Sequence, residues 1–227
     1  MSGFFGVASK KDCILPLFFG VDYHSHLGTR RGGIAVYGEE GFKRKIHNIE
    51  NSPFRTKFEN DLEQLHAKIG IGCISDNESQ PLLINSKFGS FAICTVGRVN
   101  NTEQLKEICF KNGYAQFVEM NKGVINQTEL VSSLINQKDD IVAGIQYAQD
   151  LIDGSMSIML LFKDKIIVAR LKNIIFANIE PKIFSLIFET KRYVRAVLTT
   201  KDMINAINGR FDFPIVCKIV VKHCKKA

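Results

Sequence analysis

Residues 2–8 read Ser-Gly-Phe-Phe-Gly-Val-Ala, and they predict that the chain starts with a buried strand. The evidence is the apolar run over residues 4–8, which is short and uninterrupted. Ser2 and Gly3 lead directly into this strand. A terminus anchored in a sheet would hold its α-amino group at a fixed place in space.

Hydrophobic spacing along the rest of the chain predicts more helices and strands. Helices are expected over residues 15–26, 54–65, 102–110, 128–136, 139–152 and 201–207, with Thr128 as an N-cap. Strands are expected over residues 33–37, 43–49, 69–74, 82–84, 88–96, 155–162, 165–171, 173–179, 183–189 and 215–221. Two antiparallel sheets with helices outside them is the simplest packing of these elements.

Composition indicates an ordinary globular protein. The chain has 227 residues, of which 45% are hydrophobic and 23% charged, and no linker divides it. We therefore expect one domain over residues 1–227. The formal charge of +7 comes from scattered Lys and Arg, so nucleic-acid binding is not expected. With no apolar run of 18 residues and no signal peptide, the sequence favours a cytoplasmic protein without a membrane contact.

Cysteine and histidine positions point away from a metal or cofactor. The six cysteines form no C-x-x-C pair and no metal-binding spacing, so we interpret them as reduced thiols. Cys73 is a weak candidate for a displaced nucleophile, and a buried core position is the better interpretation. His24 and His26 are two residues apart, which places them on different faces of a helix. We therefore expect no metal and no cofactor.

Several stretches, in chain order, resemble class II glutamine amidotransferases of the amidophosphoribosyltransferase type. Ser2-Gly-Phe-Phe-Gly-Val7 is similar to that family's C-G-I-F-G-I opening. The other matching stretches are Tyr23-His-Ser-His-Leu-Gly28, Gly33-Ile-Ala-Val36, Gly70-Ile-Gly72, Gln80-Pro81, Val96-Gly97-Arg-Val-Asn100-Asn101, Gln127-Thr-Glu129 and Asp153-Gly-Ser-Met-Ser157 through Ala169-Arg170. The resemblance implies an α+β fold, a four-layer αββα sandwich of two antiparallel sheets of the N-terminal-nucleophile hydrolase type.

The resemblance also implies a catalytic site, and the sequence departs from it. The family uses an N-terminal thiolate as nucleophile, an Asn side chain and a Gly amide for the oxyanion, and an Arg and an Asp to hold glutamine. At the matching positions this chain has Ser2 for the nucleophile, Val96 for the Asn, Gly97 for the Gly, Ser75 for the Arg and Gln127 for the Asp. Leu27 stands where the family's H-R-G motif has its Arg.

These departures predict a pseudoenzyme with a binding or regulatory role. An apolar Val96 cannot donate to an oxyanion, and Ser75 and Gln127 carry neither charge that would pair with glutamine. The alternative is an active amidohydrolase that uses Ser2 on a glutamine-like or less polar amide. A homo-oligomer, or a hetero-oligomer with an active paralogue, is a further expectation. The length of the chain leaves no room for a phosphoribosyltransferase domain.

Overall fold

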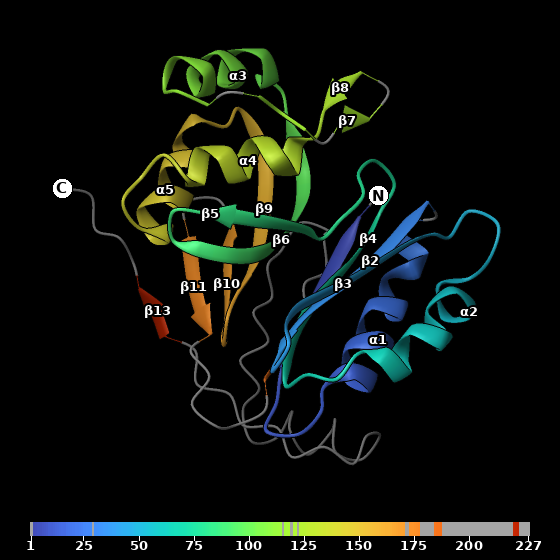
Figure 1. The fold of residues 1–227 in the computed structure, drawn as a ribbon. Helices are drawn as coiled ribbons and strands as arrows, with labels where there is room; N and C mark the ends of the chain where they lie inside the picture. Colours follow the sequence, from blue (N-terminus) through green and yellow to red (C-terminus); the bar gives the residue numbers. More distant parts are fainter. Residues whose placement is uncertain are drawn as a thin grey trace.

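The computed structural model describes residues 2–28, 30–114, 116–118, 120–121, 123–170, 173–177, 184–187 and 220–222. Two antiparallel sheets face each other within it (Figure 1). The first, sheet A, has the strand order β12-β1-β4-β2-β3, and the second, sheet B, has the order β13-β11-β10-β9-β6-β5. Helices cover the outer face of each sheet, so the four layers are α, β, β and α (Figure 1). The predicted fold class is confirmed.

Sheet A is built from the N-terminal part of the chain and one later strand. Its strands are β1 (Gly3–Ala8), β2 (Arg31–Gly38), β3 (Gly41–Asn48), β4 (Ile69–Ser75) and β12 (Phe184–Ile187). Its outer face carries α1 (Ile14–Tyr23), η1 (His24–Leu27), α2 (Phe54–Phe58) and η2 (Glu59–Gln64). Apolar side chains from both layers form one buried cluster there, with Leu17 and Phe58 fully buried.

Sheet B, like sheet A, is covered by helices on its outer face. Its strands are β5 (Leu82–Ser86), β6 (Gly89–Val99), β9 (Gly154–Phe162), β10 (Lys165–Arg170), β11 (Asn173–Ala177) and β13 (Val220–Lys222). Its outer helices are α3 (Thr102–Lys111), α4 (Gln127–Ile135) and α5 (Ile141–Leu151). A small hairpin, β7 (Met120–Asn121) and β8 (Val124–Ile125), lies before α4 and was not expected from the sequence.

A third cluster fills the space between the sheets. It includes Phe4 of β1, Cys73 of β4, Cys94 of β6, Met159 of β9 and Val168 of β10. Because side chains alternate along a strand, the neighbours of these residues face the outer helices instead. The sandwich therefore has three cores, one between the sheets and one under each helical layer.

Some predicted details are wrong. The expected helix over residues 54–65 is a five-residue α-helix followed by the 3₁₀ turn η2. Asn126, and not Thr128, is the N-cap of α4, because its side-chain oxygen accepts hydrogen bonds from two backbone amides at the start of that helix. The expected helix over residues 201–207 and most of the expected strand over residues 215–221 lie outside the described residues.

Candidate functional site

Ser2 lies at the end of the sandwich where β1 begins and β4 ends. Gly3 pairs with Ile74, and on the other side of β4 Ser75 pairs with Arg31, the first residue of β2. Strand alternation places Ser2 on the same face as Phe4, which points between the sheets. The half-buried Ser2 therefore faces the inter-sheet space at this end.

The facing part of sheet B carries a row of three residues on paired strands. Val96 of β6 pairs with Ser157 of β9, and Ser157 pairs with Arg170 of β10. All three are half-buried. Their strand neighbours Cys94, Met159 and Val168 belong to the inter-sheet core, so this row faces sheet A.

The two rows lie opposite each other across the sandwich. A Cβ atom added to Gly6 would lie 3.0 Å from Met159 Sδ and 3.3 Å from Ile166 Cδ1, so β1 packs against β9 and β10. Moving four residues back from Gly6 leads to Ser2, and moving four residues on from Ile166 leads to Arg170. Ser2 and Arg170 therefore approach the same end of the inter-sheet space.

A carboxylate of this chain occupies the N-terminus of α4 beside the two rows. Glu78 lies in the loop after β4, and its carboxylate accepts hydrogen bonds from the backbone amides of Gln127 and Thr128 and from the Thr128 hydroxyl (2.7 Å). The start of a helix attracts negative charge because its first N–H groups have no partner within the helix. An internal anion thus fills the position where this helix would bind an external one.

The two positions that hold glutamine in the resembling family are engaged by the backbone here. Ser75 is buried, and its Oγ accepts hydrogen bonds from the amides of Asn77 (3.3 Å) and Glu78 (3.1 Å). The side-chain oxygen of Gln127 accepts one from the amide of Val99 (3.1 Å). Neither side chain brings a charge to the site.

Residues 96 and 97, which the sequence resemblance places at the oxyanion position, differ in what they can offer. Gly97 has a φ of +153°, and a Cβ atom there would lie 1.8 Å from the carbonyl oxygen of Ser155. Its neighbour Val96 packs against the inter-sheet core and offers no donor. The structure thus explains why residue 97 is a glycine, but it supplies no second donor from residue 96.

The remaining candidate residues lie elsewhere. His24 is buried, with Nδ1 2.8 Å from Gly20 O, whereas His26 is exposed, which agrees with the prediction of separate faces. No cluster of metal-ligating side chains occurs among the described residues. Leu27 ends η1, and its side chain is outside the described part.

Cys73 is a core residue, as predicted. It is buried opposite the buried Cys94, and burial raises the pKa of Cys94, with the neighbouring Cys73 adding to the effect. The Cys73 thiol is enclosed by the apolar core between the sheets, so a substrate in solution cannot reach it.

Comparisons with known proteins agree with this geometry. The sequence is 28% identical over 182 residues to the amidophosphoribosyltransferase of Methanocaldococcus jannaschii, a match that spans 75% of this chain and 37% of that enzyme. The fold superposes with a TM-score of 0.66 on the glutamine phosphoribosylpyrophosphate amidotransferase from B. subtilis, complexed with ADP and GMP, at 20% identity. The chain is therefore similar in sequence to an amidophosphoribosyltransferase, and it has the fold of the matching part of the B. subtilis amidotransferase.

The likeness covers most of this chain but less than half of each relative. The B. subtilis match spans 81% of this chain and 41% of that chain. A structure described as the allosteric regulatory enzyme of purine biosynthesis superposes with a TM-score of 0.61 at 20% identity, over 77% of this chain and 37% of its own. No family model matches the sequence. Among the described residues, no helix is long and apolar enough to cross a membrane.

Sequence reasoning missed Glu78 and the arginines at this end of the sandwich. Glu78 lies in a polar loop with no pattern that connects it to a helix 49 residues later. Arg31 and Arg170 could have been noticed from strand alternation, because each stands at the end of a strand whose buried face was predicted.

Proposed function

We propose that residues 1–227 form a glutamine amidotransferase-like domain that no longer hydrolyses glutamine and acts by binding. One observation carries this proposal. Ser75 and Gln127, at the positions that would hold glutamine's carboxylate and ammonium, are uncharged, and both accept hydrogen bonds from this chain's own backbone. Binding a zwitterion there would bury two charges without partners, which is strongly unfavourable.

The loss of the oxyanion donor supports the same proposal. Removing one such donor costs about 100- to 1000-fold in rate. Even if Ser2 had a free amine as its base, Val96 would leave the tetrahedral intermediate with the Gly97 amide and no side-chain donor. The uncharged Ser75 and Gln127 weaken the binding of glutamine. The apolar Val96 slows the reaction of any glutamine that does bind.

The test is ammonia release from glutamine by the purified chain, compared with the Ser2→Ala variant. The proposal predicts equal, background rates for both proteins at millimolar glutamine. A rate that is above background and is abolished in Ser2→Ala would contradict it, and would favour an amidohydrolase that uses Ser2. Activity equal in both proteins but above background would indicate a contaminating enzyme, which an independent purification removes.

We also propose that the domain assembles with itself or with an active relative. A degraded copy can retain a binding surface after its catalytic residues change, and the three apolar cores of this chain are well formed. Size-exclusion chromatography with light scattering tests the first arrangement, and co-expression with a full-length amidophosphoribosyltransferase tests the second. A monomer in both experiments would rule the proposal out.

A further inference from the structure

Three arginines surround the Ser2 end of the inter-sheet space without an acidic partner. They are Arg31 at the start of β2, Arg98 near the end of β6 and Arg170 at the end of β10. Within the described part of the chain, none of the three forms an ion pair, and Arg31 donates only to Ser79 Oγ (2.6 Å). Of the other described arginines, Arg30 pairs with Glu50 and Arg55 with Asp22, whereas Arg44 donates to the carbonyl oxygen of Pro81 (3.3 Å).

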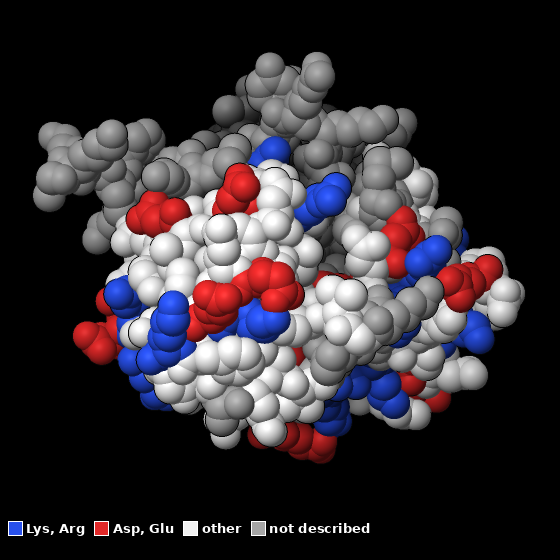
Figure 2. Space-filling model, turned by 90° about the horizontal axis from the view of Figure 1, so that it is seen from above, with Lys and Arg blue, Asp and Glu red and all other residues white. Residues whose placement is uncertain are grey.

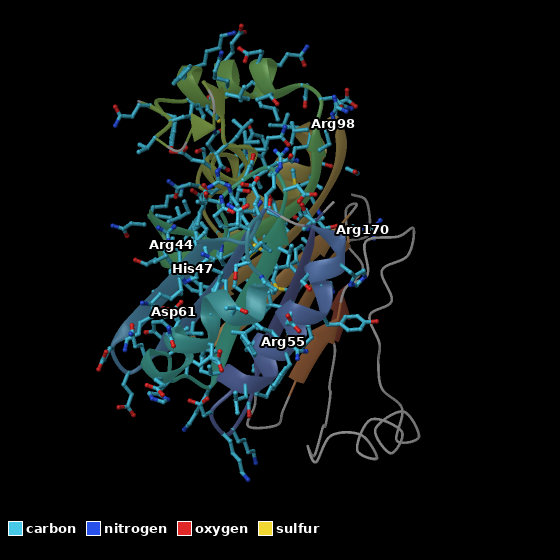
Figure 3. All side chains as sticks on the ribbon, turned by 90° about the vertical axis from the view of Figure 1, so that its right-hand side faces the viewer. Arg44, His47, Arg55, Asp61, Arg98 and Arg170 are labelled. Carbon is cyan, nitrogen blue, oxygen red and sulfur yellow. The ribbon has the colours of Figure 1, made fainter. Side chains whose placement is uncertain are left out.

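Strand alternation directs all three arginines toward the same space. Arg31 shares a face with Ala35, Arg98 with Cys94, and Arg170 with Val168, and each of these partners lies in the inter-sheet core. Figure 3 shows Arg98 and Arg170 on one side of the molecule, opposite Arg44 and His47. Seen from above, a hollow lies between the two halves of the sandwich, and both basic and acidic side chains lie near it (Figure 2).

Two of the described acidic residues near this end are engaged, whereas Asp153, next to the strand pair of Ser155 and Arg98, is exposed and forms no ion pair with a described residue. The carboxylate of Glu78 accepts three hydrogen bonds from α4, and Asp76, two residues earlier, has an interaction partner as well. The three arginines are therefore cationic groups at this end that no described side chain pairs in an ion pair. Hydroxyl groups accompany the arginines, because Ser157 lies directly beside Arg170 in the sheet register and Ser2 faces it from β1.

We propose that this end of the sandwich binds a small oxyanion that carries two or more negative charges and no cationic group, with Arg170 as its main contact. A guanidinium matches the two oxygens of a carboxylate or phosphate with parallel hydrogen bonds. Adjacent strands are about 4.8 Å apart and facing sheets about 10 Å apart, so arginines on both sheets suit a ligand with two separated anionic groups.

The placement of the described acidic side chains distinguishes this ligand from glutamine, because Asp153 is exposed and the half-buried Glu78 is already bound. A zwitterion needs a carboxylate for its ammonium group, and Glu78, which could serve, is held by α4. This inference rests on the proposed function, because a working glutaminase would use the same space for glutamine. It names the ligand class that replaces the amino acid.

Isothermal titration of the full chain with inorganic pyrophosphate and, separately, with citrate tests the proposal at low ionic strength. We expect saturable binding of at least one, with the stronger showing whether phosphate or carboxylate is preferred. Arg170→Gln should weaken that binding at least tenfold, and Arg98→Gln should weaken it less, because Arg98 is more exposed. The matched control is Lys165→Gln, which removes the same charge from the exposed, opposite end of the same strand.

The Lys165→Gln variant should bind within twofold of the unchanged protein. Equal weakening by Arg170→Gln and Lys165→Gln would mean that the anion responds only to net charge, and the proposal would be wrong. No saturable binding of either anion would also overturn it. Glutamine added to the same samples separates the two claims, because ammonia release would contradict the proposed function whatever the anions do, whereas absent anion binding leaves the proposed function standing.

Discussion

At the scale of single residues, the proposed loss of glutaminase activity rests on three side chains, those of Ser75, Val96 and Gln127, at positions whose backbone is regular. Ser75 ends β4, Gln127 begins α4, and Gly97 adopts a backbone conformation that suits glycine. Each of the three side chains lacks the charge or the donor of the family's residue, although the element beneath it is formed.

Gly97→Ala tests whether the close approach of residue 97 to the backbone of β9 excludes a side chain. The new Cβ would meet Ser155 O at 1.8 Å, at a φ of +153°, so we expect a loss of about 3 kcal/mol in the free energy of unfolding. Urea denaturation measures it. The control is Gly113→Ala, at a φ of +86° with nothing within 4 Å, which should cost only about 1 kcal/mol. Equal losses would mean that the close approach to Ser155 is unimportant.

Glu78→Gln tests the internal anion at α4. The amide oxygen can replace only one of the two accepting carboxylate oxygens, and the favourable interaction of a negative charge with the helix N-terminus is lost. We expect the free energy of unfolding to fall by about 1 kcal/mol, with Glu78→Ala costing about 2 kcal/mol because the acceptors also disappear. Glu103→Gln, an exposed change next to Lys106, is the control and should stay within about 0.5 kcal/mol. A larger effect in the control than at Glu78 would contradict the capping role.

At the scale of elements, hydrogen bonds and ion pairs between polar side chains hold some turns against the sheets. The turn η2 is attached to β3 through Asp61, which contacts His47 Nε2 at 2.5 Å and Lys45 Nζ at 3.1 Å (Figure 3). Burial raises the pKa of Asp61, but the hydrogen bonds from His47 and Lys45 outweigh it and hold the pKa below its ordinary value. The carboxylate is therefore bound more favourably in the folded chain than in the unfolded one.

The pH dependence of stability follows from this shift. Because the pKa of Asp61 is lowered by folding, its contribution is complete above the unfolded value, 3.8, and is lost as the pH falls below it. Asp61→Asn should reduce the free energy of unfolding by about 1–2 kcal/mol at pH 7. In denaturation curves measured at successive pH values, the difference between the two proteins should shrink below pH 4. If the difference in the free energy of unfolding between the two proteins grew as the pH fell, the proposed role of the Asp61 carboxylate would be contradicted.

The sequence predicted elements well where hydrophobic periodicity determines them. Strands β1, β4, β6, β9 and β10 agree with their predicted positions within a few residues, since each buries at least one apolar face. Periodicity failed over residues 54–65, where Phe54 and Phe58 keep helical spacing but the chain tightens into η2. In α1, Phe18 and Val21 are buried, whereas Phe19 and Tyr23 are exposed.

The candidate site could be predicted only in part, for a physical reason. Motif positions such as Ser75 and Gln127 are identified by their place in the chain, but hydrogen bonds between distant loops leave no periodic signal. The contact of Glu78 with α4 joins residues 49 positions apart, and the convergence of the arginines depends on how two sheets face each other. Contacts of this kind can be recognised only from the three-dimensional arrangement of the layers.

At the scale of the whole molecule, the buried thiols limit which atoms can react. Cys13 and Cys109 are both fully buried, and burial raises the pKa of Cys13 to about 12 and that of Cys109 to about 11. We expect both to resist alkylation by iodoacetamide at pH 8 in the native protein and to react fully in urea, as peptide mass mapping would show. Rapid native labelling of either would mean that its helical layer opens readily.

The central claim is that the chain retains the amidotransferase scaffold without its covalent chemistry at Ser2. The most direct measurement is the intact mass of the protein, purified from its native source, after exposure to an electrophilic glutamine analogue. The account predicts an unlabelled chain, because Val96, Ser75 and Gln127 neither bind the analogue nor stabilise its adduct. A single adduct that peptide mapping places on Ser2, in a chain that has lost Met1, would contradict it.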